Sequence, residues 1–325
     1  MGGVSRRAEA AAFPPNRFYC LLDELPLHLI PRQAREALHR RSHDAQTLIP
    51  NPDCRIMSGG QIPEELAHPA DLLSGFALQG TIAWVRLSST GSLLPFWLGQ
   101  LENLVRTWSP GEPVPETFPA EARELFRAAG ILIPEAAPAA DAGIDKSAAM
   151  FRDCGYAPLR NLIHPFHIAA LRRYYRHLIR TGAISLGDLQ SPRRYVAYNE
   201  PVARFFHHQI AAALSAVAGE PLKPSYVYLA SYLGGAELKK HTDREQCEFS
   251  VTLCLDFSPE PALATPWPIR LDTPRGAVTV YQALGDGLAY RGTRLPHYRD
   301  PLPEGHTSTS IFFHYVSADF EGSLE

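Results

Sequence analysis

The stretch SYLGGAELKKHTD, residues 231–243, is the part of the sequence that decides the expected fold. It begins at the end of a β-rich run, passes through a Gly-Gly turn and ends in His241 and Asp243. In an extended segment, residues two apart point to the same face, so these two side chains can offer an imidazole nitrogen and a carboxylate oxygen to one ion. This His-x-Asp occurs once in the chain. The stretch therefore predicts a strand, a turn and two of the ligands of a metal site.

A third ligand has to come from elsewhere, and His297 is the candidate. It lies about fifty residues further on, shortly before the last β-rich run, TSTSIFFHYV at residues 307–316. Two histidines and one carboxylate on one face of an octahedral ion leave the opposite face open, which is the arrangement that ferrous oxygenases use. The alternative interpretation is that these are ordinary surface histidines.

The sequence around these residues predicts an antiparallel β-structure. From Ser225 onward, short β-rich runs are separated by Gly, Pro and Asp: SYVYLASYL, EFSVTLCLDF, PWPIRLDT, AVTVYQAL, GLAYRG and TSTSIFFHYV. That spacing is typical of a sandwich or barrel. Two helices are expected before it, one from about His164 to Arg180 and an amphipathic one within residues 199–220. We therefore expect an α+β fold with a jelly-roll core buttressed by helices.

The segment from Ser225 to Val316 resembles the prolyl 4-hydroxylase-like branch of the 2-oxoglutarate/iron(II) oxygenases. The matching stretches are SYLGGAELKKHTD for the first ligand pair, GDGLAYRGTRLPHYRDPLPEG for the distal histidine, and the last strand. The resemblance implies a double-stranded β-helix fold, with Fe(II) held by His241, Asp243 and His297, and with 2-oxoglutarate and O₂ as cosubstrates.

One residue of the family pattern is missing. Members usually place a Lys or Arg some ten residues after the distal histidine, where it pairs with the far carboxylate of 2-oxoglutarate; here that position is Thr307. Arg299, two residues after His297, is the expected substitute, because it points to the same side of an extended strand. With the chain turning back at residues 301–306, Arg299 would lie opposite Thr307 or Thr309, whose hydroxyls would help to hold the carboxylate. There are two alternatives. Arg299 forms a surface ion pair with Asp300 or Glu304, or Arg244 is the residue that binds the far carboxylate.

Two tyrosines are further candidates for cosubstrate binding. Tyr232 lies nine residues before His241, where the family often places a tyrosine that hydrogen-bonds the cosubstrate, and Tyr228 shares its strand parity. Core-facing aromatic residues are the alternative interpretation of this spacing. His314 has the opposite parity to Thr307 and Thr309, so it is not expected to be a ligand.

The first half of the chain is predicted to be an accessory region. Residues 135–149 are rich in Ala and Pro and indicate a linker, which separates residues 1–134 from an oxygenase domain at residues 150–325. Within the first region, residues 66–134 show a strand from Thr81, a turn, a helix expected from about Pro95, and a second helix ending before Gly130. This pattern faintly resembles the winged-helix-like peptide-recognition domains of enzymes that modify ribosomally made peptides. An α+β domain that only packs on the oxygenase is the alternative.

Composition limits the partners. The net charge of −3 gives no electrostatic footprint for nucleic acid or an anionic membrane surface, so a peptide or small-molecule substrate is expected. Five scattered cysteines without a CxxC pair indicate neither a disulfide framework nor a zinc knuckle. Neither a secretory signal nor a stretch of about 18 apolar residues is present, which favours the cytoplasm.

The expected function is a hydroxylase that oxidises an unactivated C–H bond of a peptide or amino-acid-derived substrate, with succinate and CO₂ as co-products. Two rival functions remain open at this stage. One is a non-catalytic peptide-binding scaffold with a degenerate oxygenase barrel. The other is a cupin-like metal enzyme that does not use 2-oxoglutarate.

Overall fold

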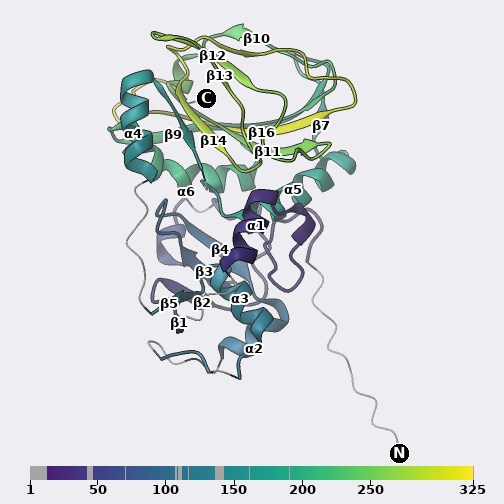
Figure 1. The fold of residues 1–325 in the computed structure, drawn as a ribbon, viewed down its shortest axis with the longest axis vertical. Helices are drawn as coiled ribbons and strands as arrows, with labels where there is room; N and C mark the ends of the chain where they lie inside the picture. The colour runs from purple at the N-terminus through teal and green to yellow at the C-terminus, as the bar shows by residue number, and fades with distance from the viewer. Residues whose placement is uncertain are drawn as a thin grey trace, which may run out of the picture.

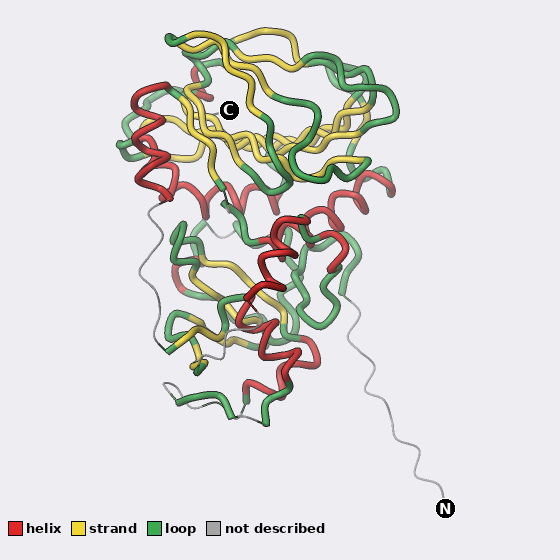
Figure 2. The backbone as a smooth tube through the Cα atoms, viewed as in Figure 1, coloured by secondary structure: helices red, strands yellow, loops and turns green. Residues whose placement is uncertain are grey.

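The computed structural model describes residues 13–41, 47–69, 71–106, 108, 112–115, 117–135, 143–160, 162–189 and 191–324. An N-terminal part and a β-sandwich are stacked along the long axis of the molecule, and two long helices pass between them (Figure 1). The tube view shows the same two layers, with the helices beneath the sandwich (Figure 2). Among the described residues, no helix combines the length and apolarity needed to cross a membrane.

The N-terminal part contains a three-stranded sheet with the order β2-β3-β4 and a two-stranded sheet formed by β1 and β5. Its elements are η1 (Leu27–Leu29), α1 (Arg32–Arg41), β1 (Leu48–Pro50), β2 (Cys54–Met57), η2 (Glu64–Leu66), β3 (Ile82–Arg86), β4 (Leu93–Trp97), η3 (Gly99–Leu101), α2 (Glu102–Val105), α3 (Ala120–Ala128) and β5 (Leu132–Pro134). Helix α3 ends as predicted, because Gly130 adopts the left-handed conformation, with φ +76°, that terminates helices. The winged-helix-like character of residues 66–134 stays a prediction.

The prediction of a helix from about Pro95 is wrong. Residues Leu93–Trp97 form β4, which pairs with β3 so that Pro95 lies opposite Trp84. Proline often begins helices, which made a helix start here plausible. All five residues of β4 are buried, however, and β4 is an edge strand, where a residue without an N–H is tolerated.

The C-terminal part consists of two facing antiparallel sheets and their helices, which is consistent with the expected jelly roll. The seven-stranded sheet has the order β6-β14-β11-β16-β9-β8-β7, and the four-stranded sheet the order β10-β15-β12-β13. The elements are α4 (Gly143–Cys154), β6 (Tyr156–Leu159), α5 (Pro165–Arg180), β7 (Ser185–Leu186), β8 (Arg194–Tyr198), α6 (Pro201–Ala218), β9 (Leu222–Leu233), β10 (Leu238–His241), η4 (Glu245–Cys247), β11 (Phe249–Ser258), β12 (Ile269–Thr273), β13 (Gly276–Val280), β14 (Gly287–Arg291), β15 (His297–Arg299) and β16 (Thr307–Ser317).

Helices α5 and α6 cover the outer face of the seven-stranded sheet. Each begins with a proline that directly follows the N-cap residue. The side chain of His164 accepts a hydrogen bond from the Phe166 amide at the start of α5, and Glu200 accepts one from Ala203 at the start of α6. Gly219, with φ +78°, ends α6. Both helices lie close to their predicted bounds.

The two parts of the chain share one hydrophobic core. A single cluster of buried residues extends from Phe18 through Phe126 in the N-terminal part to Tyr315 in the sandwich. Residues 136–142 of the predicted linker lie outside the described residues, and helix α4 begins within the rest of it, at Gly143. The division at residues 134 and 150 therefore stays a prediction, and the shared core indicates that neither part is packed independently of the other.

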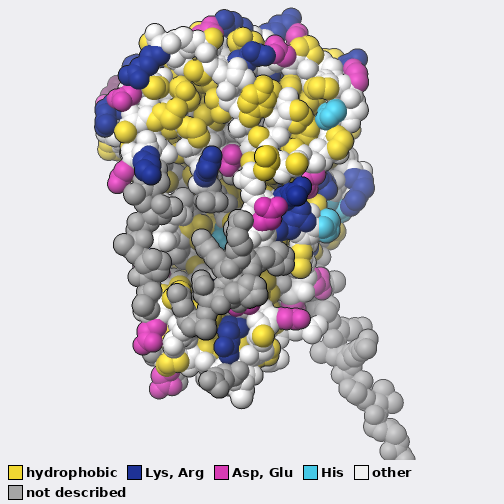
Figure 3. Space-filling view, in the orientation of Figure 1, with side chains coloured by type: hydrophobic (Ala, Val, Ile, Leu, Met, Phe, Trp, Pro, Cys, Tyr) yellow, Lys and Arg dark blue, Asp and Glu magenta, His cyan; other side chains and the backbone are white. Residues whose placement is uncertain are grey.

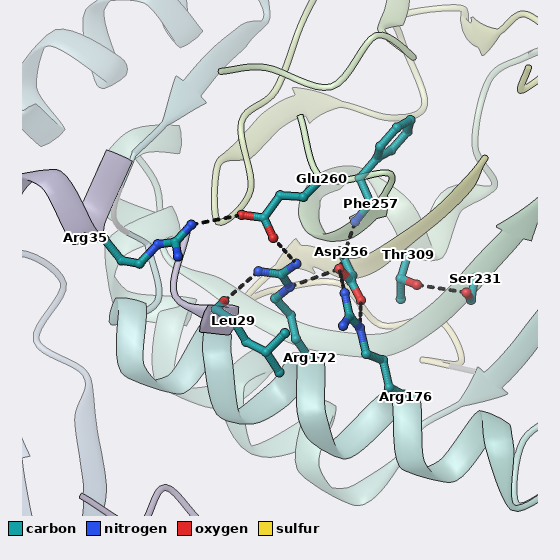
Figure 4. A network of polar contacts seen from close by, with 9 residues as sticks. All are labelled: Leu29, Arg35, Arg172, Arg176, Ser231, Asp256, Phe257, Glu260 and Thr309. Atoms are coloured by element: carbon teal, nitrogen blue, oxygen red, sulfur yellow. Dashed lines mark hydrogen bonds and ion pairs between the residues drawn. The ribbon is translucent and has the colours of Figure 1, made fainter. Parts of the chain in front are cut away.

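A buried ion network reinforces this contact (Figure 4). Arg172 on α5, whose side chain is fully buried, donates to Asp256 on β11 at 2.9 Å and to Glu260 at 2.8 Å. It also donates to the backbone carbonyl of Leu29, so one guanidinium joins the N-terminal part, the helix layer and the sandwich.

Candidate metal and cosubstrate site

His241 and His297 lie opposite one another on adjacent strands. Strands β10 and β15 are antiparallel neighbours in which these two residues are paired, and their ring centroids are 4.4 Å apart. The Nε2 atom of each ring lies 3.5 Å from Oδ1 of Asp243. The three side chains can offer ligand atoms that all lie within 4.8 Å of one another. The structure thus brings the three predicted ligands together.

The same local hydrogen bond sets the tautomer of both imidazoles. Nδ1 of His241 lies 2.7 Å from the carbonyl oxygen of Lys239, and Nδ1 of His297 lies 2.9 Å from that of Leu295. A carbonyl oxygen only accepts, so in each ring Nδ1 carries the hydrogen and Nε2 keeps its lone pair. Both lone pairs are thereby available to a metal ion on the Asp243 side of the rings.

Hydrogen bonds to neighbouring residues hold the carboxylate and the backbone of Asp243 in place. Its Oδ2 accepts a hydrogen bond of 3.0 Å from Ser250 Oγ, and its backbone amide donates to the carbonyl of Gly292. A side chain on Gly292 would place a Cβ only 2.3 Å from Oδ2 of Asp243, so the carboxylate fits only beside a glycine. Burial opposes ionisation of this carboxyl group. When the His241 and His297 rings are protonated, their hydrogen bonds to the carboxylate outweigh burial and keep the Asp243 pKa below its ordinary value; in the neutral rings, the same Nε2 positions offer lone pairs to a metal ion.

Ser250 and His314 belong to this site, although the sequence did not indicate them. Ser250 on β11 is paired with His314 on β16, and Ser250 Oγ lies 2.9 Å from Nδ1 of the His314 ring. His314 can also join Asp243 and Cys247 in a second group of possible ligand atoms. For His314 the available signal was its parity in the last strand, which was assigned to the wrong face; no pattern in the sequence singled out Ser250.

Arg299 lies inside the barrel, with 5% of its surface exposed. Its guanidinium lies 4.7 Å from the centroid of the Trp267 ring, and it donates to the Trp267 carbonyl and to Oε1 of Gln282 at 3.1 Å. Within the described chain, no carboxylate forms an ion pair with it, and burial lowers the Arg299 pKa. A buried cation without an anion is energetically unfavourable, so this position favours binding of an anionic ligand.

The contacts of Asp300, Glu304 and Arg244 do not support the two alternative interpretations of how the far carboxylate is bound. Asp300 pairs with Arg270 at 2.9 Å and Glu304 pairs with Arg193 at 3.2 Å, so neither forms a surface ion pair with Arg299. Arg244 lies over the Tyr226 ring at 4.5 Å and donates to its hydroxyl.

The predicted contact of Arg299 with Thr307 or Thr309 is wrong. Strand β15 pairs with β10 and β12 in the four-stranded sheet, whereas β16 lies in the seven-stranded sheet. Thr309 donates to Ser231 Oγ at 2.8 Å, and both threonines line a groove beside α5, on the outer face of that sheet. They are separated from the metal ligands by the sheet itself.

The two predicted tyrosines both point into the barrel. Tyr232 packs edge-on against Trp267, with ring centroids 5.1 Å apart, and so lies beside the residue that holds Arg299. The Tyr228 hydroxyl donates to Oδ2 of Asp188 at 2.7 Å, and Asp188 also pairs with Arg194. Tyr232 is therefore placed next to Arg299, while Tyr228 is engaged elsewhere.

No protein-family model matches the chain, and no curated protein matches its sequence. Solved structures do resemble it. The non-heme α-ketoglutarate-dependent epimerase SnoN of nogalamycin biosynthesis is 15% identical, with a TM-score of 0.46, over 55% of this chain and 82% of that chain. A Pseudomonas putida prolyl-4-hydroxylase is 16% identical, with a TM-score of 0.43, over 53% and 98%.

HygX from Streptomyces hygroscopicus, solved with nickel, 2-oxoglutarate and hygromycin B, is also similar. It is 14% identical, with a TM-score of 0.43, over 54% of this chain and 88% of that chain. Identities this low and TM-scores below 0.5 decide neither the reaction nor the substrate of this chain, which we infer from its own residues.

Proposed function

We propose that this chain is an Fe(II)- and 2-oxoglutarate-dependent oxygenase. His241, Asp243 and His297 would hold the iron, and Arg299 would bind the far carboxylate of 2-oxoglutarate. The donor set supports this assignment, because two neutral imidazoles and one carboxylate suit ferrous iron and leave coordination positions open. Bound iron and 2-oxoglutarate together supply the oxidation of a C–H bond by O₂, with succinate and CO₂ as co-products.

The observation that carries the proposal is the position of Arg299 relative to His297. The two residues are two apart on the same extended strand, so they enter the barrel about 7 Å from one another. That separation suits a five-carbon dicarboxylate whose one end reaches the metal and whose other end reaches the guanidinium. A guanidinium can bind a carboxylate with two parallel hydrogen bonds. A cupin-like enzyme without 2-oxoglutarate would have no need of this buried cation.

The surrounding residues have separate tasks. Trp267 and Gln282 orient the guanidinium before a ligand arrives, which reduces the entropy lost on binding. Ser250 directs one carboxylate oxygen of Asp243 away from the metal position. Among the ligands, the side chain of His241 is 39% exposed and that of His297 is 2% exposed, so the site is more open to a substrate on the His241 side.

For the reaction, we propose hydroxylation of a peptide or amino-acid-derived substrate. The open side of the site at His241 allows a substrate larger than the barrel interior to reach the metal. A degenerate, purely binding barrel is less well supported, because all three ligands and both tautomer-setting hydrogen bonds are intact.

The test is anaerobic addition of Fe(II) and 2-oxoglutarate to the metal-free protein, followed by a search for the visible metal-to-ligand charge-transfer band of the chelate. We expect a band in the native protein, its loss in His241→Ala, and a requirement for much more 2-oxoglutarate in Arg299→Ala. His28→Ala is the matched control, since His28 is exposed and lies in the N-terminal part. Iron binding without a band would instead support a cupin-like enzyme, and absence of iron binding would support a scaffold.

A further inference from the structure

A groove with a volume of about 470 Å³ lies outside the barrel, between the first described residues and helix α5. Its walls combine aromatic and basic side chains, among them Phe13, Tyr19, Arg17, Arg173, His177 and Arg180. Lys or Arg and His side chains lie on the molecular surface at the level where α5 passes beneath the sandwich, with Asp or Glu side chains beside some of them (Figure 3). No Asp or Glu of the described residues lines this groove.

The basic groups of the groove are largely without acidic partners. Arg176 is neutralised by Asp256. Among the residues that the structure describes, Arg173 donates to the backbone carbonyls of Tyr19, at 3.3 Å, and Glu24, at 3.5 Å, and to no carboxylate. Arg180 is in contact with His177, with 3.4 Å between Nη2 and Nδ1. For the guanidinium of Arg17, no ion pair is found within the described part of the chain. The groove is thus a concave site with several cations that are available to an anion.

One cation of the groove is already oriented. The Arg173 guanidinium lies 4.5 Å from the centroid of the Tyr19 ring, and Tyr19 in turn stacks on Phe13 at 4.4 Å. Stacking and two hydrogen bonds restrict the rotamers of a long side chain, so less entropy is lost when it binds a carboxylate. The adjacent aromatic faces provide contact area for apolar parts of the same ligand.

The groove continues along α5 into a second hollow of about 300 Å³. Arg176 and Arg180 line both. The second hollow is also lined by Asp256, which is paired with Arg172 and Arg176, and by hydroxyl groups of Ser231, Thr307 and Thr309. Figure 4 shows Thr309 and Ser231 beside the Arg176–Asp256 pair, above the helix. The exposed Thr307 hydroxyl can both donate to and accept from a polypeptide backbone, whereas the buried Thr309 hydroxyl already donates to Ser231. An extended ligand is therefore favoured over a compact anion, which would occupy only one end.

We propose that this groove docks an acidic segment of a polypeptide substrate, outside the barrel and away from its reacting residue. The seven-stranded sheet separates the groove from the metal ligands, so the groove anchors and does not take part in the chemistry. That the docked polypeptide is the substrate rests on the oxygenase function proposed above. Carboxylates bind guanidinium groups with two parallel hydrogen bonds, and the aromatic wall accepts an apolar residue between them.

The test measures binding by the metal-free protein, using a fluorescein-labelled peptide of sequence EEFEE and its neutral counterpart QQFQQ. We expect EEFEE to bind more tightly than QQFQQ and the paired change Arg173→Glu and Arg180→Glu to weaken EEFEE about tenfold or more. The matched control is Arg152→Glu with Arg275→Glu, which changes the net charge equally at two exposed arginines elsewhere. Far-ultraviolet circular dichroism and thermal unfolding would verify that both variants fold.

Three outcomes would overturn the proposal: equal binding of both peptides, equal loss in the control, and displacement of EEFEE by ADP at lower concentrations than by unlabelled EEFEE. The last would assign the groove to a phosphate-bearing ligand. The anaerobic 2-oxoglutarate band is measured on the same variants and should be unchanged, so failure of the docking site and failure of the oxygenase assignment give different results.

Discussion

Arg299 and Trp267 form a stacked pair inside the barrel, in which the guanidinium lies 4.7 Å from the ring centroid and donates to the backbone carbonyl of the same tryptophan. The stack holds the cation in one orientation and shields it from water. Two of its five N–H groups have acceptors in these contacts. An incoming carboxylate would meet a cation that is already desolvated and oriented, which strengthens the interaction.

Replacing Arg299 by Met should separate cosubstrate binding from folding. With Fe(II) under anaerobic conditions, 2-oxoglutarate at a hundred times its Kd should stabilise the native protein by about 2.7 kcal/mol. The variant should gain almost nothing from the same concentration. Without 2-oxoglutarate it should be at least as stable as the native protein, because an apolar chain replaces an unpaired buried charge. Urea unfolding followed by tryptophan fluorescence measures both quantities.

Arg270→Met is the control for this variant. Arg270 is also an arginine of the four-stranded sheet, but it is partly exposed and paired with Asp300. It should keep the full stabilisation by 2-oxoglutarate. A 2-oxoglutarate gain in Arg299→Met as large as that of the native protein would show that another residue holds the cosubstrate.

Ser250→Ala should weaken iron binding without unfolding the barrel. The change removes the hydroxyl that donates to Oδ2 of Asp243 and contacts Nδ1 of His314, so the carboxylate loses its orientation. Loss of such an outer partner of a metal ligand lowers metal affinity about 10–100-fold. An anaerobic Fe(II) titration with a competing chelator would measure the affinity.

Thr252→Val is the control for Ser250→Ala. It tests whether removing any buried polar group of β11 lowers the iron affinity. Thr252 is the next interior residue of the strand and contacts the Tyr290 hydroxyl at 3.3 Å rather than a metal ligand. Iron affinity should change little in this variant. Equal losses in the two variants would mean that Ser250 acts only through packing.

Much of the sandwich could be predicted from the sequence because its strands are short, β-rich and separated by turn residues. The His241 and Asp243 pair was also accessible, since it depends only on strand periodicity. The partner of β15 was not, because pairing between distant strands is decided by tertiary packing. Arg299 was expected to face β16 across a hairpin, but β15 lies in the other sheet.

The interior face of β16 could not be identified for a related reason. Residues 308–316 are all buried, with one face against the helices and the other inside the barrel. Such a strand shows no apolar and polar alternation, so parity alone leaves two choices. Thr309 faces the helices and His314 faces the barrel interior. From the sequence the opposite was expected, with Thr309 inside the barrel and His314 outside it.

Asp256→Ala should strongly destabilise the protein. Asp256 lies between Arg172 and Arg176, and its removal leaves the fully buried Arg172 guanidinium with only Glu260 as an acidic partner. Breaking one side of a buried pair costs about 3–5 kcal/mol. The free energy of unfolding in urea gives the value. Asp300→Ala, which breaks the partly exposed pair with Arg270, should cost about 0–1 kcal/mol, and similar values for both would contradict the role of burial.

Acid should destabilise the contact between the two parts of the chain. His164 and His167 on the N-terminal side of α5 lie 2.9 Å from the carbonyls of Ala128 and Pro95, respectively. Burial lowers the pKa of His164 to about 4 and that of His167 to about 3. Above pH 6.5 both are neutral in the folded and unfolded states. Below it the unfolded state takes up protons that the folded state excludes, so stability falls as pH drops toward those values.

His167→Phe should reduce this dependence. His167 is surrounded by Phe96, Phe206 and Phe18, so a phenyl ring suits the site. Each excluded proton costs about 1.4 kcal/mol per pH unit below 6.5, so between pH 7 and pH 5 the variant should lose about 2 kcal/mol less than the native protein. Urea unfolding at both pH values measures the difference, with the exposed His28→Phe as the control that keeps the native slope. If the free energy of unfolding of His167→Phe depended on pH as strongly as that of the native protein, other groups would be responsible for the acid sensitivity.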